Sequence, residues 1–419
     1  MIDLTKSVGL NLHKRSSAEI RFQSLGIISI LVSLGFLAWL LITIFAGSLG
    51  AAKHVEINIP VNLSADKVDP NNIRDASFGS IIKSGLRSRF PDVKNRKDKK
   101  KLYNLISSES TFELRDIILK NPSILGGEQN IWVSASDDLS LFFRGKMNVE
   151  VPEDQRQISD KEINWIEKLN KEGQIRSKVN WGFFKNGDSR EPEIAGILAA
   201  LVGSALSLSV CFVLSFPLGV AAATYLEQFA PRSRISDIIE VNINNLAAVP
   251  SIVFGLLGLS IFLGYFDLPR SSPLVGGMVL SLMTLPTIII ASRASLQSVP
   301  PSIKEAALAL GATPVQAVFH HVFPVALPGM LTGAIVGMAR ALGDTAPLLM
   351  IGMVAFIVDV PNSILEPATA LPVQVFLWAD SPERAFSEKT SAAIIVLLIF
   401  LIIMNLVAVL MRRRLEQRF

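Results

Sequence analysis

Long apolar runs separated by short polar segments fill the second half of the chain, and one more apolar run stands near its start. They cover about residues 25–48, 196–226, 238–264, 274–296, 326–356 and 391–411. Each run reaches or exceeds the ~20 residues that a helix needs to cross a bilayer. The first run is longer than the ~7–15 residues of a signal-peptide core and follows a basic stretch, so we expect an uncleaved anchor helix. The pattern predicts about six transmembrane helices.

A polar region at residues 50–190 interrupts this pattern. Apolar residues alternate with mostly polar neighbours from Val55 to Leu63, which predicts a strand. We expect further strands at IWVSA (131–135) and LSLFFRG (139–145), and a helix that begins with a capping box formed by Ser159 and Glu162. The region has no metal-ligand spacing and no catalytic triad pattern. We therefore predict a small α+β domain with an accessory role.

The totals agree with a membrane protein that carries one sizeable aqueous domain. The chain has 419 residues, of which 50% are hydrophobic, and its mean hydropathy is +0.44. These values exclude both an ordinary soluble protein and a pure membrane bundle. The formal charge of +4 requires no nucleic-acid partner. A single cysteine, Cys211, excludes an intrachain disulfide and any cysteine-based zinc or redox centre.

Basic residues in the short polar segments predict the orientation. If the N-terminus lies in the cytoplasm, the following residues fall on the same side: Arg232, Arg234, Arg293, Lys304, Arg412, Arg413 and Arg414. Lys and Arg are enriched in short cytoplasmic segments, whereas long segments are exempt from this rule. We therefore expect both termini in the cytoplasm and the 50–190 region outside, with its basic run KNRKDKKK (94–101) included.

The segment EAALALGATPVQAVFHHVFP (305–324) lies between two predicted spans and is rich in alanine and leucine. Two short helices joined by a glycine turn would form a rigid knob, on which small alanines allow close approach and the acid offers a charged anchor. An amphipathic helix on the membrane surface is the alternative, but it requires a basic face, and Lys304 alone supplies a poor one. We interpret the segment as a docking surface.

This segment resembles the EAA loop of ABC importer permeases, whose pattern is EAA, three residues, Gly, nine residues and Ile-x-Leu-Pro. Glu305, Ala306, Ala307, Gly311 and Pro324 match at the right spacing, whereas the Ile and Leu positions hold His321 and Phe323.

Further stretches are similar to A-type permease subunits of the phosphate-specific transport system over residues 195–411. They are FPLGVAAATYLEQFA (216–230), AAVPSIVFGLLG (247–258), TLPTIIIASRASLQSVPPSIKEAALALGA (284–312) and GMLTGAIVGMARALGDTAPLL (329–349). The anchor helix followed by a large insert is similar to a long form of that family.

The resemblance implies an all-α polytopic membrane protein with the ABC importer permease fold and an inserted small α+β extracytoplasmic domain. We divide the chain into a cytoplasmic N-terminus (1–24), an anchor helix (25–48), the extracytoplasmic domain (49–192), the permease transmembrane domain (193–411) with a cytoplasmic coupling loop (300–324), and a cytoplasmic basic tail (412–419). Such a subunit would lie in a bacterial inner membrane, with residues 49–192 in the periplasm.

The resemblance also implies partners. They are a cytoplasmic ABC ATPase dimer, a second permease subunit of the C type, an extracytoplasmic phosphate-binding protein and membrane lipid. Glu305, Ala306, Ala307 and Gly311 would couple ATP hydrolysis to transport. The chain has no G-x-x-x-x-G-K-[ST] and no HExxH, and adjacent His320 and His321 point different ways on a helix. We therefore expect no catalytic residue, cofactor or metal in this chain.

Two ionisable residues, Arg340 and Asp344, fall inside the predicted span 326–356. At 1.5 Å per residue from Pro328, Arg340 would lie ~18 Å into a hydrocarbon layer ~30 Å thick. A charge at that depth requires a partner or a hydrated cavity. Guanidinium binds oxyanions through two parallel hydrogen bonds. We place Arg340, Asp344 and Thr345 on the substrate path; a structural clamp between helices is the alternative.

Pro347 and Pro250 are predicted to kink their spans, because proline removes a backbone donor. The resemblance implies that the chain serves an ATP-driven importer that translocates inorganic phosphate. Two alternatives remain open: a permease for another oxyanion, such as sulfate or molybdate, and a membrane sensor that uses the 49–192 domain. A secondary transporter is disfavoured, because no inverted repeat with matching broken helices is found.

Overall fold

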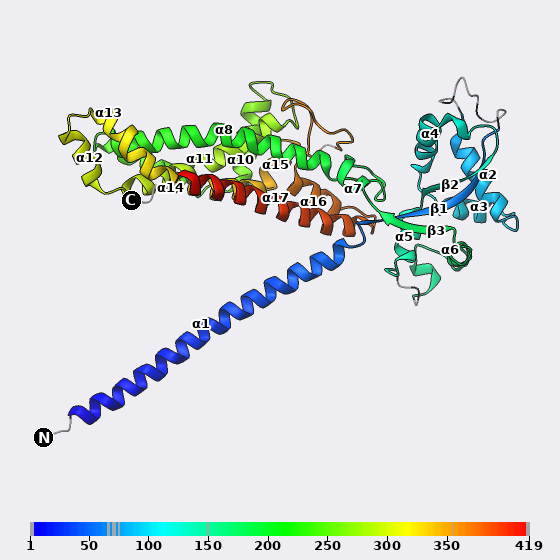
Figure 1. Cartoon of the computed structure of the whole chain (residues 1–419), viewed down its shortest axis with the longest axis horizontal. Helices are drawn as coiled ribbons and strands as arrows, with labels where there is room; N and C mark the ends of the chain where they lie inside the picture. Colours follow the sequence, from blue (N-terminus) through cyan, green and yellow to red (C-terminus); the bar gives the residue numbers. More distant parts are fainter. Residues whose placement is uncertain are drawn as a thin grey trace.

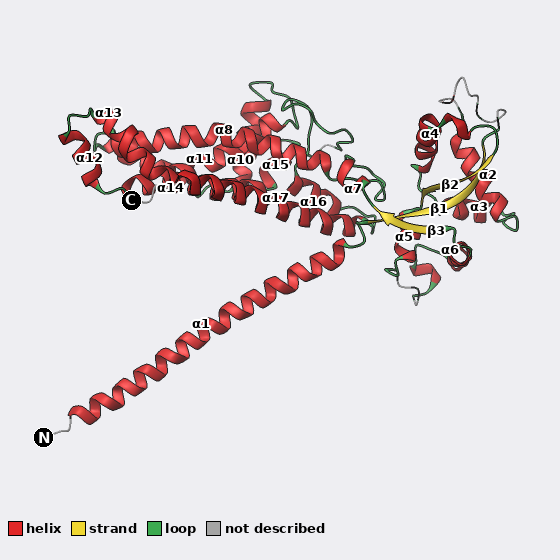
Figure 2. Ribbon diagram, in the orientation of Figure 1, coloured by secondary structure: helices red, strands yellow, loops and turns green. Residues whose placement is uncertain are grey.

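The computed structural model describes residues 4–415 apart from 65–67, 69–72, 74, 75, 148, 150 and 355. The ends of the predicted cytoplasmic segments, residues 1–3 and 416–419, lie outside the described residues. Figure 2 shows strands only at one end of the molecule and helices along the rest. The prediction of a mostly helical membrane protein with an inserted α+β domain is confirmed.

Five helical segments among the described residues are long and apolar enough to cross a membrane. They are Ala18–Ser48, Leu198–Gln228, Pro273–Gln297, Pro314–Gly343 and Phe386–Arg414. A sixth crossing requires two helices, α9 (Arg234–Ala247) and the segment Ser251–Leu263, which meet at 99°. The predicted span 238–264 is thus broken. Pro250 lies at the break, as the N-cap of α10 (Ser251–Gly258), which continues as the π-helix η4 (Leu259–Leu263).

The inserted domain, residues 49–192, is built on a three-stranded antiparallel sheet of order β2-β1-β3. The strands are β1 (Lys53–Asn62), β2 (Glu128–Ser134) and β3 (Ile175–Val179). Ile57 of the central strand faces Val133 on one side and Ile175 on the other. The predicted strands at Val55–Leu63 and IWVSA are confirmed. The apolar face of the sheet is buried against helices.

These helices are α2 (Phe78–Arg89), α3 (Arg96–Tyr103), α4 (Ser110–Lys120), α5 (Asp137–Phe143) and α6 (Asp160–Lys171), with short 3-10 turns η2 (Pro122–Ile124) and η3 (Glu153–Gln155). The capping box of Ser159 and Glu162 is confirmed at the start of α6. The strand predicted at LSLFFRG is wrong, since these residues form α5. Ser136 accepts a hydrogen bond from the Leu139 amide, and two aspartates occupy the first turn, so the helix start outweighs the local alternation.

The transmembrane bundle is centred on α8 (Leu198–Gln228) and α11 (Pro273–Gln297). A Cβ built at Gly277 of α11 would lie 2.6 Å from the carbonyl oxygen of Ser207, so the glycine permits the close approach of these helices. The bundle is completed by α12 (Pro301–Ala309), α13 (Pro314–Ala317), the π-helix η5 (Val318–Val322), α14 (Phe323–Gly343), α15 (Ala346–Met350), α16 (Leu371–Ala379) and α17 (Phe386–Leu415).

Figure 1 shows the arrangement of these parts along the long axis of the molecule. The helices α12 and α13 lie at one end of the bundle, and the inserted domain lies beyond the other end. The long helix α1 (Leu4–Ser48) diverges from the bundle. The C-terminal end of α1 meets α17, and a Cβ built at Gly47 of α1 would lie 2.8 Å from the Ser391 hydroxyl of α17. The short α7 (Gly182–Lys185) lies in the last part of the inserted domain, before α8.

Candidate functional site: a coupling knob and a broken transmembrane helix

The segment between α11 and α14 folds as two short helices joined by a tight turn. α12 ends in a Schellman motif, in which the Gly311 and Ala312 amides donate to the carbonyls of Leu308 and Ala307. Gly311 has φ of +89°, a left-handed conformation that favours glycine. Thr313 and Gln316 then form a capping box that starts α13, with Pro314 in its first turn. These local signals fix the angle between the two helices.

The base of this knob is fastened to the transmembrane bundle. Lys304 donates a 2.9 Å hydrogen bond to the side-chain carbonyl of Gln228 at the end of α8. Below α13, Val318 and Val322 are buried, and Val322 joins a cluster with Leu296 of α11 and Met330 of α14. The knob is therefore in contact with α8, α11 and α14 together.

The outer surface of the knob combines apolar side chains with one acid. Leu310 is 90% exposed, and Leu308, Val315 and Phe319 are also exposed. Glu305 and Ala306 face outward as well, whereas Ala307 is buried against the bundle. Large exposed apolar residues grouped on a rigid element are typical of an interaction site. Of the residues predicted for coupling, Glu305, Ala306 and Gly311 lie on this surface, and Ala307 supports it from below.

An ion-pair network at the same end of the bundle was missed by the sequence analysis. Arg293 of α11 contacts Glu227 of α8 at 3.3 Å and Glu240 of α9 at 2.8 Å. Gln297 donates to Glu227 at 2.9 Å. The three helices are thus held together beside the knob. Arg293 entered the sequence analysis only as a topology signal, and nothing in the pattern indicated which acids it would meet.

The candidate substrate-path residues lie at a helix end rather than in the middle of a span. The predicted continuous run 326–356 is wrong, because α14 ends at Gly343 and Asp344 adopts an extended conformation. The reason is Pro347, whose ring would collide with the carbonyl of Gly343 in a continuous helix. Arg340 therefore sits in the last turn of α14, and Asp344 does not share a helix face with it.

The substrate-path candidates Arg340, Asp344 and Thr345 differ in their exposure. Arg340 is exposed on the single chain and forms no ion pair with any side chain that the structure describes, whereas Asp344 and Thr345 are half-buried. Val336, one turn earlier on the same face, is also exposed. A guanidinium in the membrane region requires a hydrated cavity or a partner.

Pro347 lies in the first turn of the short helix α15, which touches the broken span. A Cβ at Gly255 of α10 would lie 2.7 Å from the Cα of Pro347 and 2.9 Å from the Cβ of Met350. The absence of a side chain at Gly255 brings the two interrupted spans together, one broken at Pro250 and the other at residues 344–345. Inside a membrane, irregular backbone is tolerated where it is buried in protein or lines a water-filled cavity.

Comparison with known proteins agrees with this arrangement. Residues 215–419 match the model of a family described as binding-protein-dependent transport system inner membrane component. The phosphate transport system permease protein PstA 1 of Mycobacterium tuberculosis is 30% identical over 233 residues, which cover 55% of this chain and 75% of that protein. The chain belongs to the binding-protein-dependent transport permease family. It is a multi-pass inner-membrane permease subunit, and ATP hydrolysis in such systems resides on a separate subunit.

Further comparisons match a shorter part of the chain or a more distant protein. The phosphate transport system permease protein PstA of Haemophilus influenzae is 32% identical over 195 residues, covering 45% of this chain and 66% of that protein. A chain of the MetNI methionine ABC transporter in an inward facing conformation aligns with a TM-score of 0.41 at 18% identity, covering 52% of this chain and 95% of that chain. Residues 10–153 match a domain of unknown function, DUF3333.

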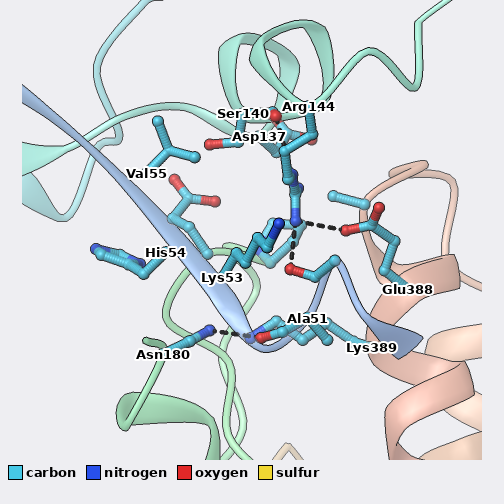
Figure 3. Close-up of a pocket in the computed structure, with 14 residues that line it drawn as sticks. Ala51, Lys53, His54, Val55, Asp137, Ser140, Arg144, Asn180, Glu388 and Lys389 are labelled. Carbon is cyan, nitrogen blue, oxygen red and sulfur yellow. Dashed lines mark hydrogen bonds and ion pairs between the residues drawn. The ribbon is translucent and has the colours of Figure 1, made fainter. Parts of the chain in front are cut away.

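The inserted domain of the permease contacts α17 through ion pairs to the buried Glu388 (Figure 3). Glu388, in the first turn of α17, contacts Arg144 at 2.7 Å and Lys146 at 2.8 Å. Arg144 also donates to the backbone carbonyl of Gly50, where a Cβ would overlap the Glu388 carboxylate. The buried Lys389 donates to the carbonyl of Ala195 at 2.8 Å. Four segments that are distant from one another in the sequence are joined at this point.

Acidic residues of the inserted domain beside this junction have raised pKa values. Burial, together with the nearby Glu191 and Asp137 carboxylates, raises the pKa of Glu193 to about 7. Burial and the charge of Asp137 raise the pKa of Asp138 to about 6. Glu193 lines a small cavity of about 20 Å³ together with Lys389 and Glu388, enough for one water molecule. Sequence patterns gave no signal for this group, since its members are scattered along the chain.

Proposed function

We propose that this chain is the permease subunit of an ATP-driven importer that carries inorganic phosphate across the inner membrane. The proposal rests on the two relatives named as phosphate transport permeases, together with the family to which the chain belongs. The observation that carries the mechanism is the rigid knob α12–α13, which exposes apolar side chains and is fastened to three transmembrane helices.

The knob would dock on a cytoplasmic ATPase dimer. Leu310, Val315 and Phe319 would enter an apolar groove of the ATPase, and the Glu305 carboxylate would meet a cationic or amide donor beside it. Closure of the ATPase dimer on binding ATP would displace the knob. Because Lys304 and Val322 tie the knob to α8, α11 and α14, these helices would move together and open the path on the other side of the membrane.

The phosphate path would run along the face of α14 that carries Arg340. An exposed guanidinium supplies two parallel donors to an oxyanion and keeps its charge at every physiological pH. Asp344 and Thr345, on the extended segment after the helix, would accept from the proton-bearing oxygen of HPO4 and donate to another oxygen, respectively. A second permease subunit of the C type would cover this face, and lipid would cover the outer faces of α1 and α17.

We infer a topology with both termini in the cytoplasm and residues 49–192 in the periplasm. The basic residues beside the spans support it, and the described C-terminal end of the chain lies at the end of the bundle that carries α12. A periplasmic phosphate-binding protein would deliver its ligand at the opposite end, beside the inserted domain.

Reconstitution in proteoliposomes tests the proposal. The chain is combined with the ATPase, the C-type permease and the binding protein, and labelled phosphate uptake is measured with and without ATP. Arg340→Ala is expected to lower uptake at least about tenfold, with Arg340→Lys retaining part of it, because a lysine keeps the charge but loses the planar fork. Glu305→Ala is expected to weaken co-purification of the ATPase while leaving the two permeases assembled.

Two results would overturn the proposal. Uptake without ATP or without the ATPase would show that ATP hydrolysis does not drive the transport. Equal competition by sulfate or molybdate, with phosphate showing no preference, would assign the permease to another oxyanion. Unchanged uptake by Arg340→Ala would remove that residue from the path and favour a role for it between helices.

A further inference from the structure

Positive charge in this protein is concentrated in one short segment of the inserted domain. Residues 83–103 contain nine Lys and Arg but only two Asp. The remainder of the chain holds 31 Lys and Arg against 34 Asp and Glu, so it is slightly acidic although the whole chain carries +4. Membrane topology does not explain this segment, since it lies within a long insert.

The segment forms α2, α3 and the connection between them, at the end of the molecule farthest from the transmembrane bundle (Figure 1). Six of its basic side chains are exposed, namely Lys83, Arg87, Lys94, Arg96, Lys97 and Lys100. The bundle and the rest of the inserted domain lie between this face and the knob. With the topology proposed above, a partner of this face comes from the aqueous space beyond the membrane.

The charges of α3 act on its stability in both directions. Arg96 and Lys97 occupy the first turn, where the helix dipole repels cations, whereas Asp98 in the same turn and Lys100 and Lys101 in the last turn are favourable. Arg96 and Lys100 lie four residues apart on one face and repel each other. The helix is held by a hydrogen bond from the Lys97 amide to the Asn95 side chain and by one fully buried residue, Leu102. A polyanion would remove this repulsion on binding.

The six exposed cations of α2, α3 and their connection form a basic patch. The side chains of this patch indicate the class of partner. No large apolar residue between 83 and 103 is among the exposed ones, and Tyr103 is covered by the Lys83 ammonium at 5.6 Å from the ring centroid. Protein interfaces are centred on buried aromatic and apolar anchors and are depleted in lysine. Clustered lysines without such an anchor suit a partner that offers many negative charges and no pocket.

We propose that the face formed by α2 and α3 binds a linear anionic polymer of the extracytoplasmic space. The six exposed cations of the patch contact successive phosphate or carboxylate groups of the polymer and displace its counterions. The contact holds the distal end of the permease complex to the polymer without reading its sequence. The location of the polymer rests on the topology proposed above, whereas the binding itself does not.

Long-chain inorganic polyphosphate is the probe for this proposal. The full chain in nanodiscs made of neutral lipid is titrated with fluorescent polyphosphate at several salt concentrations. Binding is expected to weaken steeply with salt, because released counterions carry most of the affinity. The double variant Lys97→Gln/Lys100→Gln is expected to bind about tenfold more weakly, with a log–log salt slope smaller by roughly 1.4–1.8, about 0.7–0.9 for each lost contact.

The matched control is Lys120→Gln/Lys185→Gln, which removes two exposed lysines of the inserted domain outside the patch. It is expected to bind polyphosphate like the wild-type chain. The proposal is overturned if wild-type chain does not bind at low salt, or if both double variants lose affinity equally. Preferential binding to vesicles of anionic phospholipid, or to an acidic binding protein, with no affinity for polyphosphate would assign the patch to that partner instead. Phosphate uptake plays no part in this test, so its outcome is independent of the transport assay.

Discussion

A carboxylate oxygen of Glu388, in the first turn of the last transmembrane helix, lies 2.7 Å from a guanidinium nitrogen of Arg144 in the inserted domain. The Glu388 side chain is 5% exposed and that of Arg144 is 12% exposed, so the pair is shielded from water. Glu388 also contacts Lys146. An inserted domain held in this way cannot rotate freely on its two connections, and its position is coupled to α17.

Glu388→Gln is expected to loosen this junction. The substitution keeps the shape of the side chain but leaves Arg144 buried without its counter-charge, which costs about 3–5 kcal/mol for a buried pair. We expect the thermal unfolding midpoint of the inserted domain, followed by tryptophan fluorescence, to fall accordingly. The control is Glu172→Gln, because Glu172 is 43% exposed and lies 3.6 Å from Arg89. An exposed pair contributes about 0–1 kcal/mol, so the control should barely change the midpoint.

Gly311→Ala is expected to impair coupling through backbone strain alone. Gly311 has φ of +89°, and a Cβ there would meet no atom within 4 Å, so no collision contributes. A non-glycine residue in this conformation costs about 1–2 kcal/mol. We expect a reduced rate of ATP-driven phosphate uptake in proteoliposomes with the transmembrane helices intact.

The inserted domain offers a control for this strain. Gly126 has φ of +103°, and a Cβ there would also meet no atom within 4 Å. Gly126→Ala therefore places a similar strain in the inserted domain, far from the knob. Uptake should survive this change. Equal losses in both variants would mean that general destabilisation, rather than the geometry of the knob, lowers transport.

The sequence predicted the features that depend on short-range patterns. Apolar runs of bilayer length gave the spans, and the spacing from Glu305 to Gly311 gave the knob, since helix caps and a glycine turn are local devices. The break in the span at 343–347 could have been predicted by the same reasoning, because a proline collides with the carbonyl four residues earlier. The ion pair Arg144–Glu388 could not have been predicted from local patterns, since tertiary structure alone brings these two distant residues together.

Gly255→Val is expected to separate the two broken spans. The added side chain would meet the backbone of Pro347 and the Cβ of Met350, neither of which can move aside without shifting α15. Such overpacking costs about 1–3 kcal/mol. We expect lower phosphate uptake, measured with the amount of assembled complex held constant. Gly35→Ala is the control, because a Cβ at Gly35 of α1 meets no atom within 4 Å, and alanine favours a helix.

Glu193→Gln is expected to alter how the stability of the inserted domain depends on pH. The pKa of Glu193 is about 7 in the folded chain against an ordinary value of 4.5, so the folded state holds a proton that the unfolded state releases. This group therefore favours folding fully below about pH 4.5, and its contribution is lost as the pH rises through 7. The half-buried His54 acts in the opposite direction, since desolvation lowers its pKa and acidification penalises the folded state. The test is consequently the difference between wild type and variant, from thermal unfolding at pH 5, 6, 7 and 8. The wild-type chain should gain stability relative to Glu193→Gln as the pH falls across this range, whereas a constant difference would show that Glu193 is ionised in the folded state throughout.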